Sequence, residues 1–128
     1  MLTIEKRTAR RLVLGLVLSC VLSGCAPPGA RALLEGKRLI DRRKYDRAVE
    51  QLQLATSLLP TNAQAWNYLG LAYHGAGRAT NALAAYQKAL TLDPGLAEAR
   101  YNLGCLWLQQ GRAELRAREL AAAEKSFR

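Results

Sequence analysis

A period of 34 residues places the narrowest limits on what this chain can fold into. Residues 63–96 resemble residues 97–112 when shifted forward by 34 positions, and residues 29–62 when shifted back. Such a period is typical of a stack of small units, each burying its apolar face against the next. The pairs that align are Leu69 with Leu103, Gly70 with Gly104, Tyr73 with Trp107, Gly77 with Gly111, Arg78 with Arg112, Gly70 with Gly36, Ala82 with Ala48, Ala89 with Ala55 and Pro94 with Pro60.

The spacing of apolar residues in the central unit predicts two antiparallel helices. Trp66, Leu69 and Tyr73 stand at i, i+3 and i+7, which is one face of a helix over about 63–75. A second helix is expected over about 79–91, with one face formed by Ala82, Tyr86, Ala89 and Leu90.

Small and polar residues predict how these two helices meet and where they begin. Gly70 and Ala82 are small enough to let the helices approach closely. Gly77 suits a turn with positive φ between them. Thr61 with Gln64 has the spacing of a capping box, so we expect it to begin the first helix.

The central unit resembles the tetratricopeptide repeat family. That family is recognised by an ordered set of aromatic, Leu-Gly, Ala and Pro positions. The resemblance implies an all-α solenoid of about three helix-turn-helix repeats, at residues 29–62, 63–96 and 97–128. The residues that fill the family positions are Trp66, Leu69, Gly70, Tyr73, Ala82, Tyr86, Ala89 and Pro94.

The first repeat departs from this pattern but remains compatible with it. Aliphatic residues replace its aromatics, and these still bury in a core. Arg43, beside Lys44, takes the position of the turn glycine. Asp46 is expected to cap the second helix.

The third repeat departs further. Its first helix is expected at about 97–110, but Arg116 falls where a small residue belongs. A shift of seven residues restores the pattern with Ala123 and Phe127. No capping helix follows, although solenoids normally need one. Two alternatives stay open: the chain is truncated, or another molecule covers this face.

The first residues have the layout of a signal peptide, predicted over residues 1–24. A basic start precedes Leu12–Leu22, eleven residues without charge, and small residues follow. A bilayer span needs about 20 apolar residues, so this segment is too short to cross one.

The end of this segment, Leu22-Ser23-Gly24-Cys25, resembles the lipobox of bacterial lipoproteins. The resemblance implies that Cys25 carries a covalent lipid and begins the mature protein, with residues 25–29 as the lipidated cysteine and a short tether. By the same resemblance, Ala26 stands where lipoproteins kept at the inner membrane carry Asp, which implies the periplasmic side of the outer membrane rather than the inner membrane. The alternatives are an uncleaved signal anchor and an ordinary signal peptide cut elsewhere.

Composition argues against several other classes of protein. Hydrophobic residues make up 50% of the chain and charged residues 23%, which excludes a disordered tail. One histidine and three cysteines leave little material for a metal or catalytic site. We therefore predict a protein that is not an enzyme and has no cofactor or metal. Cys105 and His74 form the one conceivable catalytic pair, against which a buried free thiol is the alternative.

Membership of this family would place a partner protein or peptide in a groove lined by the first helix of each repeat. The groove would be lined by an amide, an aromatic and aliphatic residues, which suits a peptide with apolar anchors. It does not match the subfamily that clamps a C-terminal carboxylate, because Leu33, Tyr68 and Glu98 occupy the clamp positions. The expected groove residues are Gln64, Asn67, Leu71, His74, Glu98, Tyr101, Cys105 and Leu108, with Leu33, Lys37 and Ile40 equivalent in the first repeat.

Basic residues are abundant in the remaining chain. Residues 25–128 contain fifteen basic and nine acidic residues, a net charge of +6. A basic stretch, residues 37–47, lies near the expected lipid and either contacts anionic lipid head groups or forms a solvated helix end. Nucleic acid is not expected as a partner, because the chain is exported and Tyr45 alone supplies an aromatic to this stretch.

Three functional hypotheses follow. The first is a lipid-anchored adaptor that holds a partner in envelope assembly or secretion. The second is the N-terminal part of a larger enzyme, such as a glycosyltransferase or a peptidase. The third is self-association through the uncapped third repeat.

Overall fold

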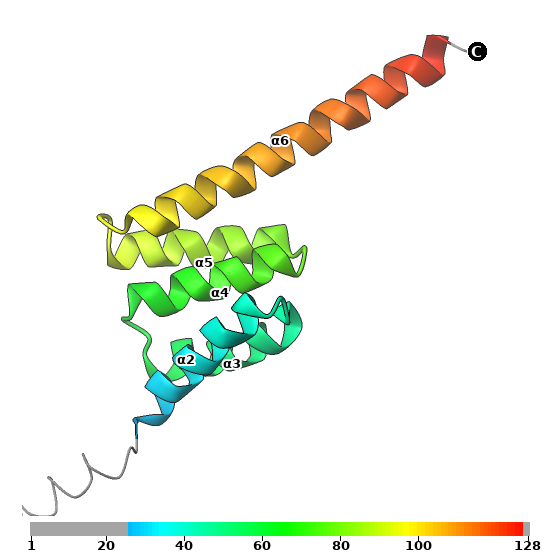
Figure 1. Cartoon of the computed structure of the whole chain (residues 1–128). Coiled ribbons are helices and arrows are strands. Elements are labelled where there is room, and N and C mark those ends of the chain that lie inside the picture. The colour runs from blue at the N-terminus through cyan, green and yellow to red at the C-terminus, as the bar shows by residue number, and fades with distance from the viewer. Residues whose placement is uncertain (1–25, 127–128) are drawn as a thin grey trace, which may run out of the picture.

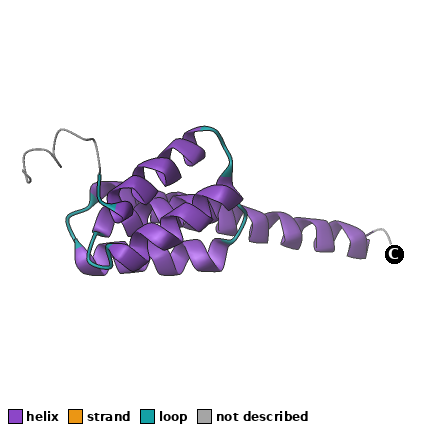
Figure 2. Ribbon diagram, turned by 90° about the horizontal axis from the view of Figure 1, so that it is seen from below, coloured by secondary structure: helices purple, strands orange, loops and turns teal. Residues whose placement is uncertain are grey.

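The computed structural model describes residues 26–126. These residues form helices and loops, with no strand among them (Figures 1 and 2), so the all-α prediction is confirmed. The helices are α2 Pro28–Asp41, α3 Tyr45–Leu58, α4 Ala63–Gly75, α5 Ala79–Leu92 and α6 Ala97–Ser126.

The helices stack as antiparallel pairs. Helix α2 packs on α3, and α4 packs on α5. The pairs join because α3 also packs on α4, and α5 on the N-terminal part of α6. The stack therefore follows the 34-residue period of the sequence.

Glycine makes the close contact within each complete pair. A Cβ atom added to Gly70 would lie 2.6 Å from the ring of Tyr86, and one added to Gly36 would lie 2.4 Å from Leu52. Both distances are too short for a real side chain, so the expectation that Gly70 allows close approach is confirmed.

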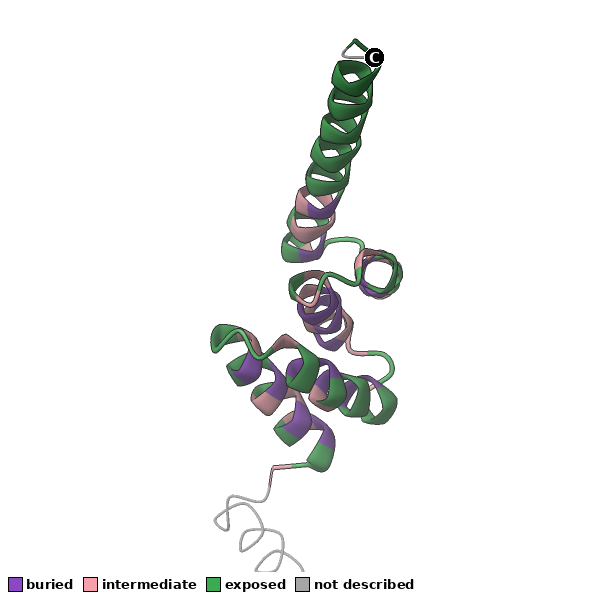
Figure 3. Cartoon of the chain, turned by 90° about the vertical axis from the view of Figure 1, so that its right-hand side faces the viewer, coloured by how far each residue is buried: buried purple, intermediate pink, exposed green. Residues whose placement is uncertain are grey.

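The core runs through the centre of the stack (Figure 3). Alanines on the second helices also lie in this core, where Ala48 and Ala82 are fully buried. Trp66 is half-buried beside this core, and its indole Nε1 donates a hydrogen bond of 2.9 Å to the carbonyl of Pro60. The larger core residues are Leu39, Val49, Leu52, Leu69, Tyr73, Tyr86 and Leu106.

The turns within the first two repeats use the same backbone conformation. Gly77 has φ 76°, as its place in the pattern predicts. Arg43, one period earlier, has φ 57°, in the left-handed region that a non-glycine residue rarely adopts. The first repeat therefore keeps the turn without its glycine.

Two predictions of helix caps are wrong. Asn62, not Thr61 with Gln64, caps α4, because its Oδ1 accepts a hydrogen bond of 3.0 Å from the backbone N–H of Ala65. Asp46 does not cap α3: it lies in the first turn, where its carboxylate accepts a hydrogen bond of 2.9 Å from Arg78. The N-cap position of α3 is Lys44, whose side chain makes no capping hydrogen bond, so only the loop geometry decides which residue takes each cap position.

The prediction of a second helix in the third repeat is also wrong. Helix α6 runs without a break from Ala97 to Ser126, past Gly111, and its C-terminal half extends away from the stack (Figure 1). A turn at Gly111 would bring Arg116 to the place that Ala48 and Ala82 fill in the other repeats, where no side-chain volume is free. The segment after Gly111 is rich in Ala, Glu, Arg and Leu, which favour continued helix.

Several predictions fall outside the described residues. The signal peptide over residues 1–24, the lipidation of Cys25 and the packing of Phe127 belong to this group. Within residues 26–126, none of the helices combines the length and apolar content needed to cross a membrane.

Candidate functional site

The first helices of the three repeats line one face of the molecule. Helix α4 contacts α2 on one side and α6 on the other, whereas α3 and α5 do not touch each other. The surface along α2, α4 and α6 is therefore continuous and is the place of the predicted groove.

A pocket of about 440 Å³ lies in this surface between α4 and α6. Four predicted groove residues line it: Asn67, Leu71, Glu98 and Tyr101. The remaining lining residues are Tyr68, Ala97 and Asn102. The pocket thus combines two tyrosine rings and a leucine with a carboxylate and two amides, which suits an apolar side chain on a peptide backbone.

Leu71 connects this pocket to a second one of about 300 Å³. The second pocket lies between α2, α4 and α6 and includes His74 and Ile40, as predicted. Its other lining residues are Tyr45, Gly75 and Gln109. The two pockets form neighbouring positions along one groove, with Leu71 between them.

Polar side chains tie α4 to α6 at the base of the first pocket. The amide of Gln64 donates a hydrogen bond of 2.6 Å to Glu98, and Asn102 donates one of 3.0 Å to Oδ1 of Asn67. Asn67 also donates to Glu98, at 3.5 Å, and is only 1% exposed. Asn67 is therefore part of the pocket floor, with its amide already engaged, while Glu98 lies exposed at the rim.

The structure does not bring His74 and Cys105 together as a pair. Nε2 of His74 lies 2.5 Å from Oε1 of Gln109. Since an amide oxygen only accepts, this ring nitrogen is the donor. Cys105 instead interacts with Tyr101 one helical turn away, and this hydrogen bond raises the pKa of the Tyr101 hydroxyl.

One cation lies at the edge of the groove. Nζ of Lys37 is 5.9 Å from the centre of the Tyr68 ring, within the range of a cation–π contact. Lys37 on α2 and Glu98 on α6 thus put opposite charges on the two sides of the first pocket. This favours a ligand that also carries both charges, or none.

The end of the groove is formed by α6 alone. Cys105 and Leu108, both predicted, line a hollow of about 490 Å³ with Gln109, Arg112, Ala113 and Arg116. Leu108 is exposed there, with no second helix of the third repeat to limit the hollow.

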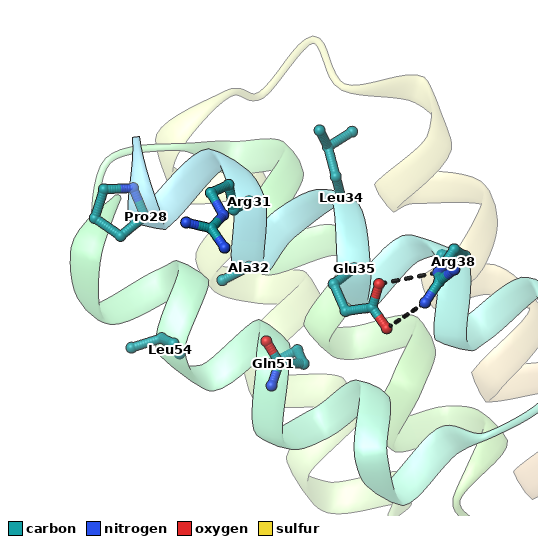
Figure 4. Close-up of a pocket in the computed structure, with 8 residues that line it drawn as sticks. All are labelled: Pro28, Arg31, Ala32, Leu34, Glu35, Arg38, Gln51 and Leu54. Atoms are coloured by element: carbon teal, nitrogen blue, oxygen red, sulfur yellow. Dashed lines mark hydrogen bonds and ion pairs between the residues drawn. The ribbon is translucent and has the colours of Figure 1, made fainter. Parts of the chain in front are cut away.

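A larger hollow lies elsewhere, on the α2–α3 side of the first repeat (Figure 4). It has a volume of about 690 Å³, and Leu34 and Leu54 are its exposed apolar residues. Arg38 is held by two hydrogen bonds to Glu35, at 2.9 and 3.0 Å, which lower the pKa of the Glu35 carboxyl. The remaining lining residues are Pro28, Arg31, Ala32 and Gln51.

The sequence did not single out five residues that line the two pockets joined at Leu71: Tyr45, Gly75, Ala97, Asn102 and Gln109. Asn102 and Gln109 were missed because neither fills a position of the repeat pattern. Asn102 lies one 34-residue period after Tyr68, and Gln109 lies one period after Gly75. Applying the period to these two positions of α4 would have identified both residues as part of the groove. Tyr45 enters from the start of α3, which no spacing within a single helix predicts.

The chain belongs to the tetratricopeptide repeat family, whose pattern it matches over residues 33–97. It is also 34% identical to the cellulose synthase operon protein C of Escherichia coli K12 over 109 residues, which cover 80% of this chain and 9% of that protein. A peroxisomal targeting signal receptor from Candida albicans is 39% identical over 61 residues, 48% of this chain and 10% of the receptor. The chain thus spans about a tenth of the length of these relatives.

The same fold occurs in a crystal structure of the Sgt2 TPR domain from Aspergillus fumigatus. The TM-score is 0.64 at 22% identity, over 70% of this chain and 59% of that one. Tetratricopeptide repeats mediate contacts between proteins, so the coarse prediction of an interaction module is confirmed. Among residues 26–126, no group of three or more His, Cys, Asp or Glu side chains is arranged to hold a metal. The absence of an enzymatic activity stays a prediction.

Proposed function

We propose that the protein is a lipid-anchored adaptor of the bacterial cell envelope. Its α2–α4–α6 groove binds a peptide segment of a partner protein in envelope assembly or secretion. The observation that carries the proposal is the pair of pockets joined at Leu71, because they offer two neighbouring sites for apolar side chains.

The expected ligand follows from the lining of these pockets. Tyr68, Leu71 and Tyr101 provide apolar walls for side chains such as Leu or Phe. The exposed carboxylate of Glu98 can accept hydrogen bonds from backbone N–H groups or from a basic side chain of the ligand. An extended or helical peptide with two apolar residues near each other fits this arrangement.

A selection from a random peptide library against the purified protein tests the groove. Enriched peptides should share paired apolar anchors. Leu71→Ala should weaken their binding about tenfold, because the residue forms a wall of both pockets. Leu54→Ala is the matched control, since it removes a partly exposed leucine of α3, away from the groove.

The proposal fails if Leu71→Ala leaves binding unchanged while the melting temperatures of both variants match the unmodified protein. It also fails if Leu54→Ala weakens binding as much. In that case the peptide occupies the hollow on the α2–α3 side.

The anchor is proposed on the lipobox resemblance, and the outer membrane is the favoured site. The protein produced in bacteria with a labelled fatty acid should incorporate the label, and Cys25→Ser should abolish it. Cys105→Ser is the control, as it removes a free thiol outside the lipobox. Label retained by Cys25→Ser would contradict the anchor without affecting the groove.

The second candidate is the TPR part of a larger enzyme such as a glycosyltransferase or peptidase. It is favoured by one observation, the small fraction of its longer relatives that the chain covers. Immunoblotting of the native host with an antibody against residues 63–96 distinguishes the two. A band near 14.0 kDa, or slightly below it after processing, supports the adaptor. A much larger band supports the enzyme.

A further inference from the structure

Helix α6 carries a stripe of side chains that the rest of the molecule leaves uncovered. Tyr101, Leu108, Leu115 and Ala122 recur every seven residues and are all exposed. The α6 residues that pack into the stack, Ala99 and Leu106, point to the opposite side of the helix. From residue 107 to residue 126 every side chain of α6 is exposed. Helices in water owe most of their stability to a packed face, and this half has none.

Two glycines interrupt the stripe at regular places. Gly104 and Gly111 each follow a larger residue of the stripe by three positions, which is the second core position of a seven-residue coiled-coil repeat. A Cβ atom added to either would have nothing within 4 Å, whereas Gly36 and Gly70 are each filled by a side chain of a facing helix. The stripe therefore alternates exposed leucines with open gaps.

We propose that α6 pairs with α6 of a second copy of this chain, antiparallel, through this stripe. The two helices pack as in a coiled coil, with the two core positions of each seven-residue repeat facing each other. Leu108 then enters the gap at Gly111 of the partner subunit, and Leu115 enters the gap at Gly104 of the partner subunit. The two-fold axis repeats both contacts, so one stripe supplies the leucines and the gaps that it needs.

Charge and shape favour this orientation. The antiparallel arrangement sets Arg118 against Tyr101 of the partner subunit, a contact of cation and ring. In a parallel pair Arg118 would instead face its own copy, and two like charges would meet. Since α2 to α5 lie beside the N-terminal half of α6, a parallel pair would also force two stacks side by side (Figure 1). The antiparallel pair puts them at opposite ends.

The alternative occupant is the chain itself, with residues 113–126 folded back at Gly111. In that hairpin Leu120 would fill the gap at Gly104, sixteen residues earlier, as Leu52 fills Gly36 and Tyr86 fills Gly70. Leu120 lies on the other side of the straight helix from Leu115, and its exposed fraction of 72% is similar to the 59% of Leu115. These two leucines therefore separate the models cleanly.

The test is the polypeptide mass of the full chain in mild detergent, by light scattering as its concentration is raised. The mass should rise from that of one chain, 14.0 kDa before removal of the signal peptide and somewhat less after it, toward twice that value. Leu115→Ala should raise the dissociation constant at least about tenfold, because each dimer loses two buried leucines. Leu120→Ala should leave it unchanged, with equal helix content in both variants.

Gly111→Leu provides a second test. The substitution adds apolar surface and raises helix propensity, so an unspecific association through α6 would become stronger. If Leu108 of the partner subunit packs into the gap at Gly111, the new side chain fills that gap and the dimer becomes weaker. A monomer at every concentration, or a dimer that depends on Leu120 and not on Leu115, would overturn the proposal. None of these variants changes a residue of the two pockets joined at Leu71, so failure here is distinct from failure of the groove.

Discussion

The first repeat has Arg43 where the pattern has a glycine, and the backbone is strained at this residue. Its φ of 57° is unfavourable for any side chain with a Cβ atom. Arg43→Gly should therefore raise the free energy of unfolding by about 0.5 to 1 kcal/mol, after the larger chain entropy of glycine is subtracted. Gly77→Ala, at the equivalent turn, should lower it by about 1 kcal/mol. Urea unfolding of both variants checks the pair, and changes of the same sign would contradict the account.

Tyr86 buries a hydroxyl group that has no hydrogen-bond partner among the described residues. Such a group costs about 1 to 3 kcal/mol, so Tyr86→Phe should stabilise the protein by about 1 kcal/mol. Tyr73→Phe is the contrasting variant. It should destabilise by about 1 kcal/mol, because the Tyr73 hydroxyl accepts a hydrogen bond of 2.9 Å from Gln53. Thermal unfolding at neutral pH compares the two, and the account fails if Tyr86→Phe proves the more costly.

The same tyrosine predicts a dependence on pH. Burial, reinforced by the nearby Cys105, raises the pKa of Tyr86 above its usual value of 10.0. The folded protein therefore keeps this proton at a pH where the unfolded chain loses it. Stability should fall as the pH rises above about 10, and the fall should be shallower in Tyr86→Phe. Equal slopes in the two proteins would mean that the hydroxyl is solvated.

At the scale of the helices, the same residue type has opposite roles in neighbouring repeats. Gly70 faces the ring of Tyr86 at a distance that admits no side chain, and Gly104 faces open space. Gly70→Ala should cost about 1 to 3 kcal/mol through overpacking. In the monomer, at dilutions where no dimer forms, Gly104→Ala should instead stabilise α6 by about 0.5 to 1 kcal/mol through helix propensity. Chemical denaturation of dilute protein distinguishes the two variants, and a destabilising Gly104→Ala there would show that a helix of the same chain already covers that face.

The helices were predictable where apolar period and small residues agree. Trp66, Leu69 and Tyr73 fixed the face of α4, and Gly77 marked its end. The third repeat was not predictable in this way. Its pattern contains the turn glycine and the following arginine, but Arg116 has the wrong volume for the close contact. A periodic pattern indicates which positions match the repeat. A second helix can pack, however, only if the residue at every close helix contact is small enough.

At the scale of the whole molecule, the helix face on which the groove residues lie was easier to predict than the contacts between their side chains. The repeat period gives the faces of α2, α4 and α6, and residues such as Leu71 and Tyr101 lie there as expected. It does not reveal that the amide of Asn67 is engaged by Asn102 and Glu98. Nor does it reveal that His74 meets Gln109. These contacts depend on the rotation of α6 against α4, which only the packed structure fixes.

The most direct test of the account is an NMR titration of the isotope-labelled protein with a peptide selected from the library. The account predicts that chemical shifts change most at Tyr68, Leu71 and Tyr101, which line the first pocket. They should change little along the outer faces of α3 and α5. Changes centred instead on Leu34 and Leu54 would contradict it, because they would move the binding site to the opposite hollow and leave the groove without a ligand.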